Sequence, residues 1–330
     1  MKKRVLIVRL DAIGDYVLWR NCLGFLRNCA KYRDAHLTVL GNPVWRNLAE
    51  TFDADCADEW IWVENRGELF RRGWENLLPR MVWHRRVAAA QARLKAMLVS
   101  RGFDEVISPC AFPDALLDEL VVGIAPISIS VANGDKARSS RFSRLVNSGV
   151  DPFVFCRNRA IASAMAGTQC DVQLELSVED PPAKTNRVLF FPGASHWTRR
   201  WPARRWRKLR KMAPSGFETV LAPTGTTLAE FVRLVKSCAA VVSNDTMALH
   251  VAAALGVPAV GIVNGVSGRS DFWPYPASLG KNVEVCFPKK IPRVPISLLG
   301  SRLAQYIALS SVSASSVADA LRRVLEVQSP

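Results

Sequence analysis

Hydroxyl, guanidinium and carboxylate side chains follow several predicted strands of this 330-residue chain, each where a strand passes into a helix. The run PGASHWTRRWP (192–202) ends in Pro202, which is typical of the first position of a helix. Free N–H groups at a helix start, hydroxyls and guanidinium groups together suit a phosphate or diphosphate. Exposed arginines beside an ordinary helix would give the same pattern, so this loop alone leaves both interpretations open. The candidate ligand-binding residues are Ser195, Thr198, Arg199 and Arg200.

A second polar loop, SNDTMALH (243–250), takes a buried strand into a helix. Helix capping would by itself explain Asp245 and Thr246. His250, however, follows Thr246 by four residues and therefore lies on the same side of that helix. A single histidine in a helix is more often structural than functional. The candidates from this loop are Asn244, Asp245, Thr246, Met247 and His250.

Two further loops complete the set. The run APTG (222–225) supplies Thr224 and Gly225 after another predicted strand of the second half. In the first half, Gly14 and Asp15 follow the first predicted strand, where glycine permits a tight turn and the carboxylate lies at a helix start. Asp15 could cap that helix, or it could act as a general base that takes a proton from an attacking hydroxyl.

The elements that must position these residues alternate between strand and helix, which predicts two parallel α/β domains. A polar stretch with two prolines (176–186) indicates the boundary, so we expect domains at 1–180 and 181–330, with a ligand cleft between the carboxyl ends of their sheets. We expect the last two helices, within 297–327, to be candidates for packing back on the first domain. The predicted strands are 4–10, 36–40, 105–108, 127–131, 187–191, 219–222, 239–243 and 258–263. The other predicted helices are 15–28, 43–49, 75–100, 246–255 and those beginning at 202 and 228.

Charge is the main anomaly of the composition. The chain has 44 Lys and Arg against 29 Asp and Glu, a formal charge of +15, while its 49% hydrophobic content is ordinary for a globular protein. Such a surplus predicts a polyanionic partner: nucleic acid, an anionic membrane or a phosphorylated small molecule. No G-x-G-x-x-G and no G-x-x-x-x-G-K-[ST] follows a strand, which disfavours a dinucleotide-dependent oxidoreductase and an ATPase.

Cysteine usage and hydropathy indicate a cytoplasmic protein. The eight cysteines form no C-x-x-C pair and have no histidine at a metal-ligand spacing, so we expect reduced thiols and no metal site. No cleavable leader is predicted, and the longest apolar stretch, 251–263, is too short to span a bilayer.

Taken together, RLDAIGDYVL (9–18), FFPGASHWTRRWPARRW (190–206) and SNDTMALHVAAALGVPAVGI (243–262) resemble glycosyltransferase family 9, the ADP-heptose:lipopolysaccharide heptosyltransferases. The resemblance implies the GT-B architecture of two Rossmann-like domains and an inverting transfer that needs neither metal nor cofactor. It implies a nucleotide-sugar donor, most directly ADP-heptose, and a lipopolysaccharide core or related surface glycan as acceptor. By position, Asp15 matches the catalytic base, and the loops at 195–200 and 244–250 match the donor site.

On the acceptor side, the candidates are Asp11, Gly14, Arg85 and Arg86, the last two within an Arg- and Trp-rich segment at 66–101. Residues 181–217 contain ten cations and no Asp or Glu, which fits an anionic glycolipid or the inner face of the cytoplasmic membrane better than nucleic acid. The ten are Lys184, Arg187, Arg199, Arg200, Arg204, Arg205, Arg207, Lys208, Arg210 and Lys211.

Two other functions remain open from the sequence. Some sugar-nucleotide epimerases share the GT-B architecture, and they would act on a nucleotide sugar without an acceptor. A non-catalytic protein that binds RNA or another polyanion would also account for the charge and the ten tryptophans, although no RNA-binding motif accompanies them.

Overall fold

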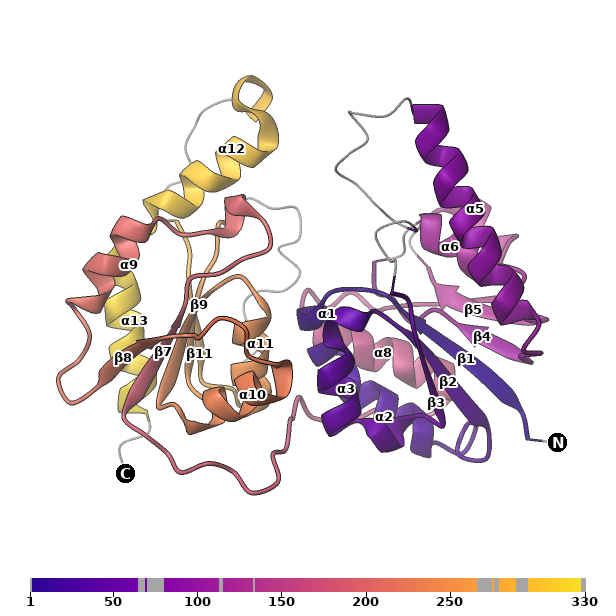
Figure 1. Cartoon of the computed structure of the whole chain (residues 1–330), viewed down its shortest axis with the longest axis horizontal. Helices are drawn as coiled ribbons and strands as arrows, with labels where there is room; N and C mark the ends of the chain where they lie inside the picture. The colour runs from indigo at the N-terminus through magenta and orange to yellow at the C-terminus, as the bar shows by residue number, and fades with distance from the viewer. Residues whose placement is uncertain are drawn as a thin grey trace. The chain divides into compact units, whose positions relative to one another are not determined.

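The computed structural model describes residues 2–64, 69, 80–112, 115–132, 134–265, 275, 279–288 and 296–327. The chain forms two compact units, each an α/β domain (Figure 1). Unit 1 comprises Met1–Asp151 and Phe155–Val172, and unit 2 comprises Pro152–Val154 and Gln173–Pro330.

Unit 1 is built on a parallel sheet with the strand order β3-β2-β1-β4-β5-β6. The central strand β1 pairs with β2 on one side and with β4 on the other, so the order of the strands reverses at β1. In open α/β sheets, ligands bind at the carboxyl ends of the strands where this reversal occurs. The strands are β1 (Arg4–Arg9), β2 (His36–Gly41), β3 (Glu59–Trp62), β4 (Glu105–Ile107), β5 (Ile127–Val131) and β6 (Arg144–Val146).

Helices connect these parallel strands. They are α1 (Ile13–Val17), α2 (Arg20–Asn28), α3 (Arg46–Phe52), α5 (Arg80–Val99), α6 (Ala115–Val121), α7 (Lys136–Ser139) and α8 (Val154–Ala166), with the short helices η1 (Pro43–Trp45) and η2 (Ala54–Cys56). The predicted helix at 75–100 is observed as α5, although residues 75–79 lie outside the described part. Strands β3 and β6 and helix α8 were not predicted, because they are short or lack a clear period.

The single helix predicted over 15–28 is wrong, because the chain forms α1 and α2 with a break at Leu18 and Trp19. The side-chain amide of Asn158 in α8 donates a buried hydrogen bond of 2.8 Å to the carbonyl of Leu18. That carbonyl is therefore engaged outside its own helix. A contact made 140 residues away in the chain has overridden the local helical periodicity.

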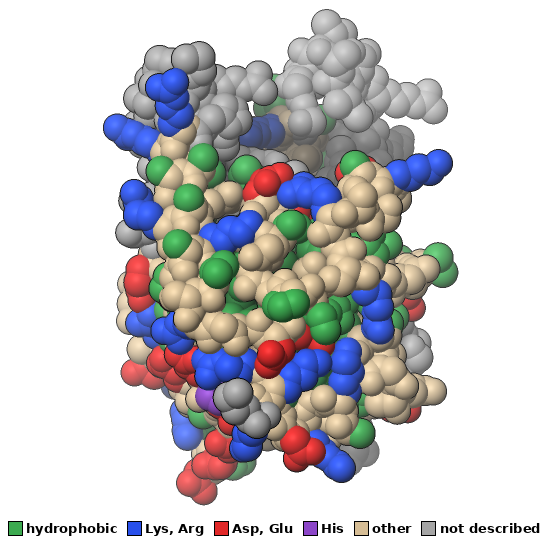
Figure 2. All heavy atoms as spheres, turned by 90° about the vertical axis from the view of Figure 1, so that its right-hand side faces the viewer, with side chains coloured by type: hydrophobic (Ala, Val, Ile, Leu, Met, Phe, Trp, Pro, Cys, Tyr) green, Lys and Arg blue, Asp and Glu red, His purple; other side chains and the backbone are tan. Residues whose placement is uncertain are grey.

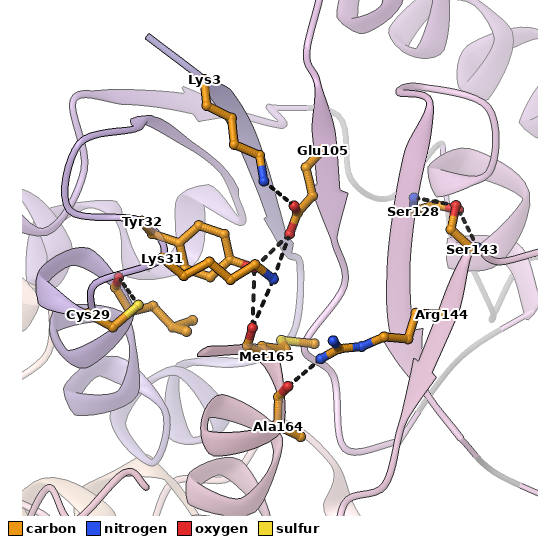
Figure 3. Close-up of polar contacts among 11 residues, drawn as sticks. Lys3, Cys29, Lys31, Tyr32, Glu105, Ser128, Ser143, Arg144, Ala164 and Met165 are labelled. Atoms are coloured by element: carbon orange, nitrogen blue, oxygen red, sulfur yellow. Dashed lines mark hydrogen bonds and ion pairs between the residues drawn. The ribbon is translucent and has the colours of Figure 1, made fainter. Parts of the chain in front are cut away.

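A buried polar cluster fixes the amino-terminal edge of the unit 1 sheet (Figure 3). The Glu105 carboxylate, 2% exposed at the start of β4, accepts hydrogen bonds from Lys3 Nζ at 2.5 Å and Tyr32 Oη at 2.6 Å. Lys31 Nζ links the cluster to α8 through the Met165 carbonyl at 2.9 Å. Burial raises the pKa of Glu105, but the hydrogen bonds from Lys3 and Tyr32 outweigh it and leave that pKa below its usual value.

Unit 2 has a second parallel sheet, with the strand order β11-β10-β9-β7-β8. Here β7 lies between β9 and β8, so the order of the strands again reverses, at the carboxyl end of β7. The strands are β7 (Arg187–Phe191), β8 (Glu218–Leu221), β9 (Ala240–Asn244), β10 (Ala259–Ile262) and β11 (Val283–Cys286). The helices are α9 (Ala203–Arg210), α10 (Leu228–Ser237), α11 (Met247–Ala254), α12 (Ile296–Ser311), α13 (Ala314–Glu326) and the short η3 (Trp197–Arg199).

Two packing contacts shape unit 2. A side chain on Gly261 of β10 would come within 2.6 Å of Leu249, so the glycine allows α11 to lie close against the sheet. Helix α13 buries Val317, Leu321 and Val324 in the core of the same unit. Helix α13 is amphipathic, and its apolar face packs against β9 and β10. Within the described part of the chain, no helix is long and apolar enough to span a bilayer.

Candidate functional site

Asp15 lies in the first turn of α1, directly after β1, where the strand order of unit 1 reverses. Its Oδ2 accepts a hydrogen bond of 3.3 Å from the backbone N–H of Ala12, so Asp15 partly caps the start of α1. The side chain is half-buried. Because a single long bond engages only one carboxylate oxygen among the described contacts, Asp15 retains the capacity to accept a proton.

A buried arginine supports the turn that carries Asp15. Arg9, 2% exposed at the end of β1, donates to the Pro109 carbonyl at 2.6 Å and to the Asp15 carbonyl at 3.4 Å. Its Nε lies 2.7 Å from Oδ2 of Asp11, and its guanidinium lies over the Trp19 ring at 5.1 Å. Asp11, proposed from sequence as an acceptor-side residue, is thus engaged in an ion pair at the base of this turn.

In unit 2, one arginine joins the two polar loops that follow β7 and β9. Arg199 in η3 donates from Nη2 to Ser195 Oγ at 2.6 Å and from Nη1 to the Asp245 carbonyl at 3.3 Å. Candidate residues from two separate loops of the sequence therefore lie in one cluster. The guanidinium retains further N–H donors for an anionic ligand.

Asn244 is buried beneath these loops and holds them together by hydrogen bonds. It is fully buried, donates from its side-chain amide to the Pro192 carbonyl at 2.6 Å and accepts from the backbone N–H of Trp201 at 3.2 Å. These two bonds hold both ends of the loop at 192–201 against the end of β9. Asn244 therefore holds the loop that carries several of the other candidate residues.

The start of α11 is not capped by a side chain. Thr246 occupies the N-cap position, but no hydrogen bond from a backbone N–H reaches its hydroxyl, which instead lies 2.9 Å from Ser243 Oγ. Capping therefore does not account for Thr246. Met247, half-buried, is the first residue of the helix. The N–H groups at this helix start give a partial positive charge that suits a phosphate.

His250, one turn further along α11, is buried and uncharged. Its Nδ1 lies 2.6 Å from the hydroxyl of Tyr275. Burial, with a further contribution from the positive charge of Arg199, lowers the pKa of His250 to about 3. The histidine can exchange hydrogen bonds but cannot supply positive charge to a ligand near neutral pH.

The remaining candidate residues have no hydrogen bond to the Arg199 cluster among the described contacts. Thr198 is buried, and its hydroxyl lies 2.8 Å from His196 Nδ1. Arg200 is exposed and donates to the Ala194 carbonyl at 3.0 Å. The other four are Thr224 and Gly225 in an exposed turn, where Gly225 has a φ of +81°, and the exposed Arg85 and Arg86 of α5.

Three residues that contact the candidate site residues were not predicted from the sequence. Arg9 could have been noticed as a charged residue at the end of an apolar strand, and Ser243 as a hydroxyl three residues before Thr246. Tyr275 gave no such signal, because it is 25 positions from His250 and its segment has no regular pattern.

Comparisons with known proteins agree with this fold. Residues 213–279 match glycosyltransferase family 9 (heptosyltransferase). A glycosyltransferase family 9 structure from Veillonella parvula superposes with a TM-score of 0.68 at 16% identity, covering 99% of this chain and 98% of that one. No protein of curated function matches the sequence.

Two heptosyltransferases of E. coli have the same fold. WaaC, solved with ADP-2-deoxy-2-fluoro heptose, gives a TM-score of 0.68 at 18% identity and covers 99% of this chain and 100% of its own. ADP-heptose lipopolysaccharide heptosyltransferase II gives 0.64 at 20% identity, with 99% of both chains covered. The match over residues 213–279 confirms the resemblance to glycosyltransferase family 9, and with the shared fold it identifies the chain as a glycosyltransferase of the GT-B architecture.

Proposed function

We propose that the protein is an inverting, metal-independent glycosyltransferase that moves a heptose from ADP-heptose onto a lipopolysaccharide core or a related surface glycan. The observation that carries the proposal is the placement of Arg199 between Ser195 and Asp245, beside the uncapped start of α11. This is a cluster of donors suited to a diphosphate. The ADP-sugar analogue in the WaaC structure supports the choice of nucleotide.

The donor residues act by stabilising the leaving group. As the bond between the sugar and the diphosphate breaks, negative charge accumulates on the diphosphate oxygens. Arg199, Arg200 and the N–H groups at the start of α11 stabilise that charge, and they cost little reorganisation because Arg199 is already held by its neighbours. Asn244 contributes by holding the loop that carries both arginines.

Asp15 acts as the general base in this proposal. It takes the proton from an acceptor hydroxyl as the hydroxyl oxygen attacks the anomeric carbon from the face opposite the diphosphate, so the configuration inverts. Arg9 is a positioning residue, because it binds the Asp15 carbonyl and pairs with Asp11 at the base of the turn. Arg85 and Arg86 are proposed to contact the anionic acceptor, and contact with the inner face of the cytoplasmic membrane would follow from a lipid-linked acceptor.

A transfer assay with the Asp15→Asn variant tests the proposal. With ADP-heptose and lipopolysaccharide core, the wild type should release ADP only when both are present. Asp15→Asn keeps an oxygen for the Ala12 N–H but cannot take a proton, so transfer should fall about 10²- to 10⁴-fold while donor binding, measured by thermal shift, stays unchanged.

Three outcomes would contradict it. Turnover of the nucleotide sugar without any acceptor would indicate an epimerase. Full transfer activity in Asp15→Asn would remove Asp15 as the base, and loss of donor binding in a folded Asp15→Asn protein would give this residue a different role.

A further inference from the structure

Helix α9 has an exposed face of unpaired positive charge. No Asp or Glu occurs anywhere between residues 181 and 217. Among the described residues, none of the exposed cations on this helix forms an ion pair with a carboxylate; the ion pairs of unit 2 involve β7, β11 and α13. We name this set the α9 basic face: Arg204, Arg207, Lys208, Arg210 and Lys211.

Helix stability does not explain the α9 basic face. Arg204 and Lys208, and likewise Arg207 and Lys211, are four residues apart, where like charges destabilise a helix. The helix dipole favours the cations of the last turn, but Arg204 is the second residue of the helix, where a positive charge is unfavourable. The opposite side of α9 is an ordinary buried face formed by Trp206 and Leu209.

Some half-exposed cations of unit 1 form ion pairs with carboxylates. Arg27 pairs with Asp58 at 2.9 Å, and Arg141 pairs with Glu119 at 2.9 Å. Figure 2 shows Lys and Arg side chains lying beside Asp and Glu side chains over the lower part of the face drawn there. The absence of acidic neighbours is therefore a local property of the α9 segment and not a general consequence of the net charge of +15.

Apolar and aromatic side chains are exposed next to the α9 basic face. The carboxyl-terminal part of α12 lies next to the start of α9 (Figure 1), where Arg205 donates a hydrogen bond of 3.4 Å to the Ser310 carbonyl. Trp197 is 44% exposed, with its ring 5.4 Å from that of Tyr306 in α12, and Leu303 of α12 is 38% exposed. Between the two helices lies a cavity of about 490 Å³ lined by Pro202, Ala203, Arg204, Tyr306, Ile307 and Ser310.

We propose that the α9 basic face, with Trp197, Leu303 and the cavity between α9 and α12, docks the protein on an anionic phospholipid bilayer. Arginine and lysine would contact headgroup phosphates, and Arg204 extends this contact into the cavity. Tryptophan, with its apolar ring and polar N–H, suits the bilayer interface, and an exposed leucine gains from contact with acyl chains. Charge alone would also suit RNA, but the exposed leucine would gain little there.

This inference deepens the proposed function by assigning a surface to its lipid-linked acceptor, and it uses no residue of the catalytic turn. Its test is binding of the full chain to vesicles without any nucleotide or glycan. Wild-type protein should cosediment with vesicles of phosphatidylcholine containing about one-third phosphatidylglycerol, should not bind pure phosphatidylcholine, and should dissociate as salt rises.

A matched pair of triple variants locates the surface. Arg207→Gln, Lys208→Gln and Lys211→Gln together should weaken binding about 100-fold, because each cation near an anionic surface contributes a factor of about five. The control, Lys2→Gln, Arg33→Gln and Lys136→Gln in unit 1, removes the same charge from exposed positions that have no proposed role and should leave binding within about twofold. Thermal unfolding should show that the α9 variant is folded and still stabilised by ADP.

Three results would overturn the inference: no preference of the wild type for anionic vesicles, an equal loss in both triple variants, or tighter binding to a single-stranded RNA oligonucleotide that the α9 variant abolishes. The assay is independent of sugar transfer. A failed transfer assay with intact vesicle binding would therefore count against the proposed function alone, and the reverse result would count against the docking surface alone.

Discussion

Arg199 affects three other groups at once. It binds Ser195 and the Asp245 carbonyl directly, and its charge adds to the burial that keeps His250 neutral. Asp15 is likewise both a partial helix cap and the proposed base. At the level of single residues, structural and catalytic roles therefore coincide, and variants are informative only when they separate the two.

The buried His250 predicts a specific pH dependence of stability. Its pKa is about 3 in the folded protein against 6.5 for a free histidine, so the unfolded chain binds the proton first as the pH falls. Stability should therefore fall from about pH 6.5 downwards, and between pH 6.5 and pH 5 this one group accounts for about 2 kcal/mol. Urea unfolding at pH 7.5 and pH 5 measures the difference.

His250→Gln, which keeps a polar side chain for Tyr275, should lose this fall in stability, whereas His36→Gln at a half-exposed position should keep it. An unchanged pH dependence in His250→Gln would show that His250 is not buried as a neutral group.

Elements, more than single side chains, bring the donor residues together. The ends of β7 and β9 are neighbours in the sheet, with Phe191 opposite Ser243, so the loops that follow them meet. Asn244 then ties the loop at 192–201 to the end of β9 at two points. The close packing of α11 on Gly261 holds the helix start beside them.

Asn244→Ala should therefore weaken both stability and donor binding. It leaves the buried Trp201 N–H without its acceptor, at a cost of about 1–3 kcal/mol, and also removes the bond to the Pro192 carbonyl. The affinity for ADP should fall because the loop that carries Arg199 is no longer held. Chemical denaturation and calorimetric titration measure the two effects.

The comparison variant is Arg200→Gln, which loses only an exposed bond to the Ala194 carbonyl and should change stability by less than about 0.5 kcal/mol. If Asn244→Ala were as stable as this control and bound ADP as well as the wild type, Asn244 would have no role in holding the loop.

The whole molecule consists of two units with separate hydrophobic cores, one around β1 and β4 and the other around β7, β9 and α13. The proposed reaction takes its base from unit 1 and its donor contacts from unit 2. A ligand or substitution that acts on one unit should therefore change the unfolding transition of that unit alone. The proposed donor site belongs to unit 2, and the Glu105 cluster stabilises unit 1.

Differential scanning calorimetry should show two transitions. ADP at a hundred times its Kd should stabilise only the transition of unit 2, by about 2.7 kcal/mol. Glu105→Gln should lower only the transition of unit 1, by about 1–3 kcal/mol, because charged hydrogen bonds from Lys3 and Lys31 are lost. A single transition that both changes shift equally would show that the two units unfold as one cooperative body.

Much of the fold could be predicted from local patterns. Apolar runs such as 187–191 and 239–243 are buried on both faces and flanked by turns, and they appear as β7 and β9 within one residue. Strands β6 and β11 were not predicted, because both lie at an edge of their sheet and are only partly buried, so their sequences are not continuous apolar runs like that of the equally short β4. The helix at 15–28 failed because a partner distant in the chain, Asn158, engages the Leu18 carbonyl.

By itself the sequence determined the chemistry available to this protein: the residue types in the loops after the strands, the concentration of positive charge at 181–217, and the alternation of strand and helix. These depend on neighbours within a few positions. Only the tertiary structure decided which candidates contact one another. It places Arg199 between Ser195 and Asp245, and it buries Asn244, which bonds to the Pro192 carbonyl. It also buries His250 in its neutral form beside the hydroxyl of Tyr275. Burial and hydrogen-bond partners depend on strand order and packing between distant segments, which local periodicity does not encode.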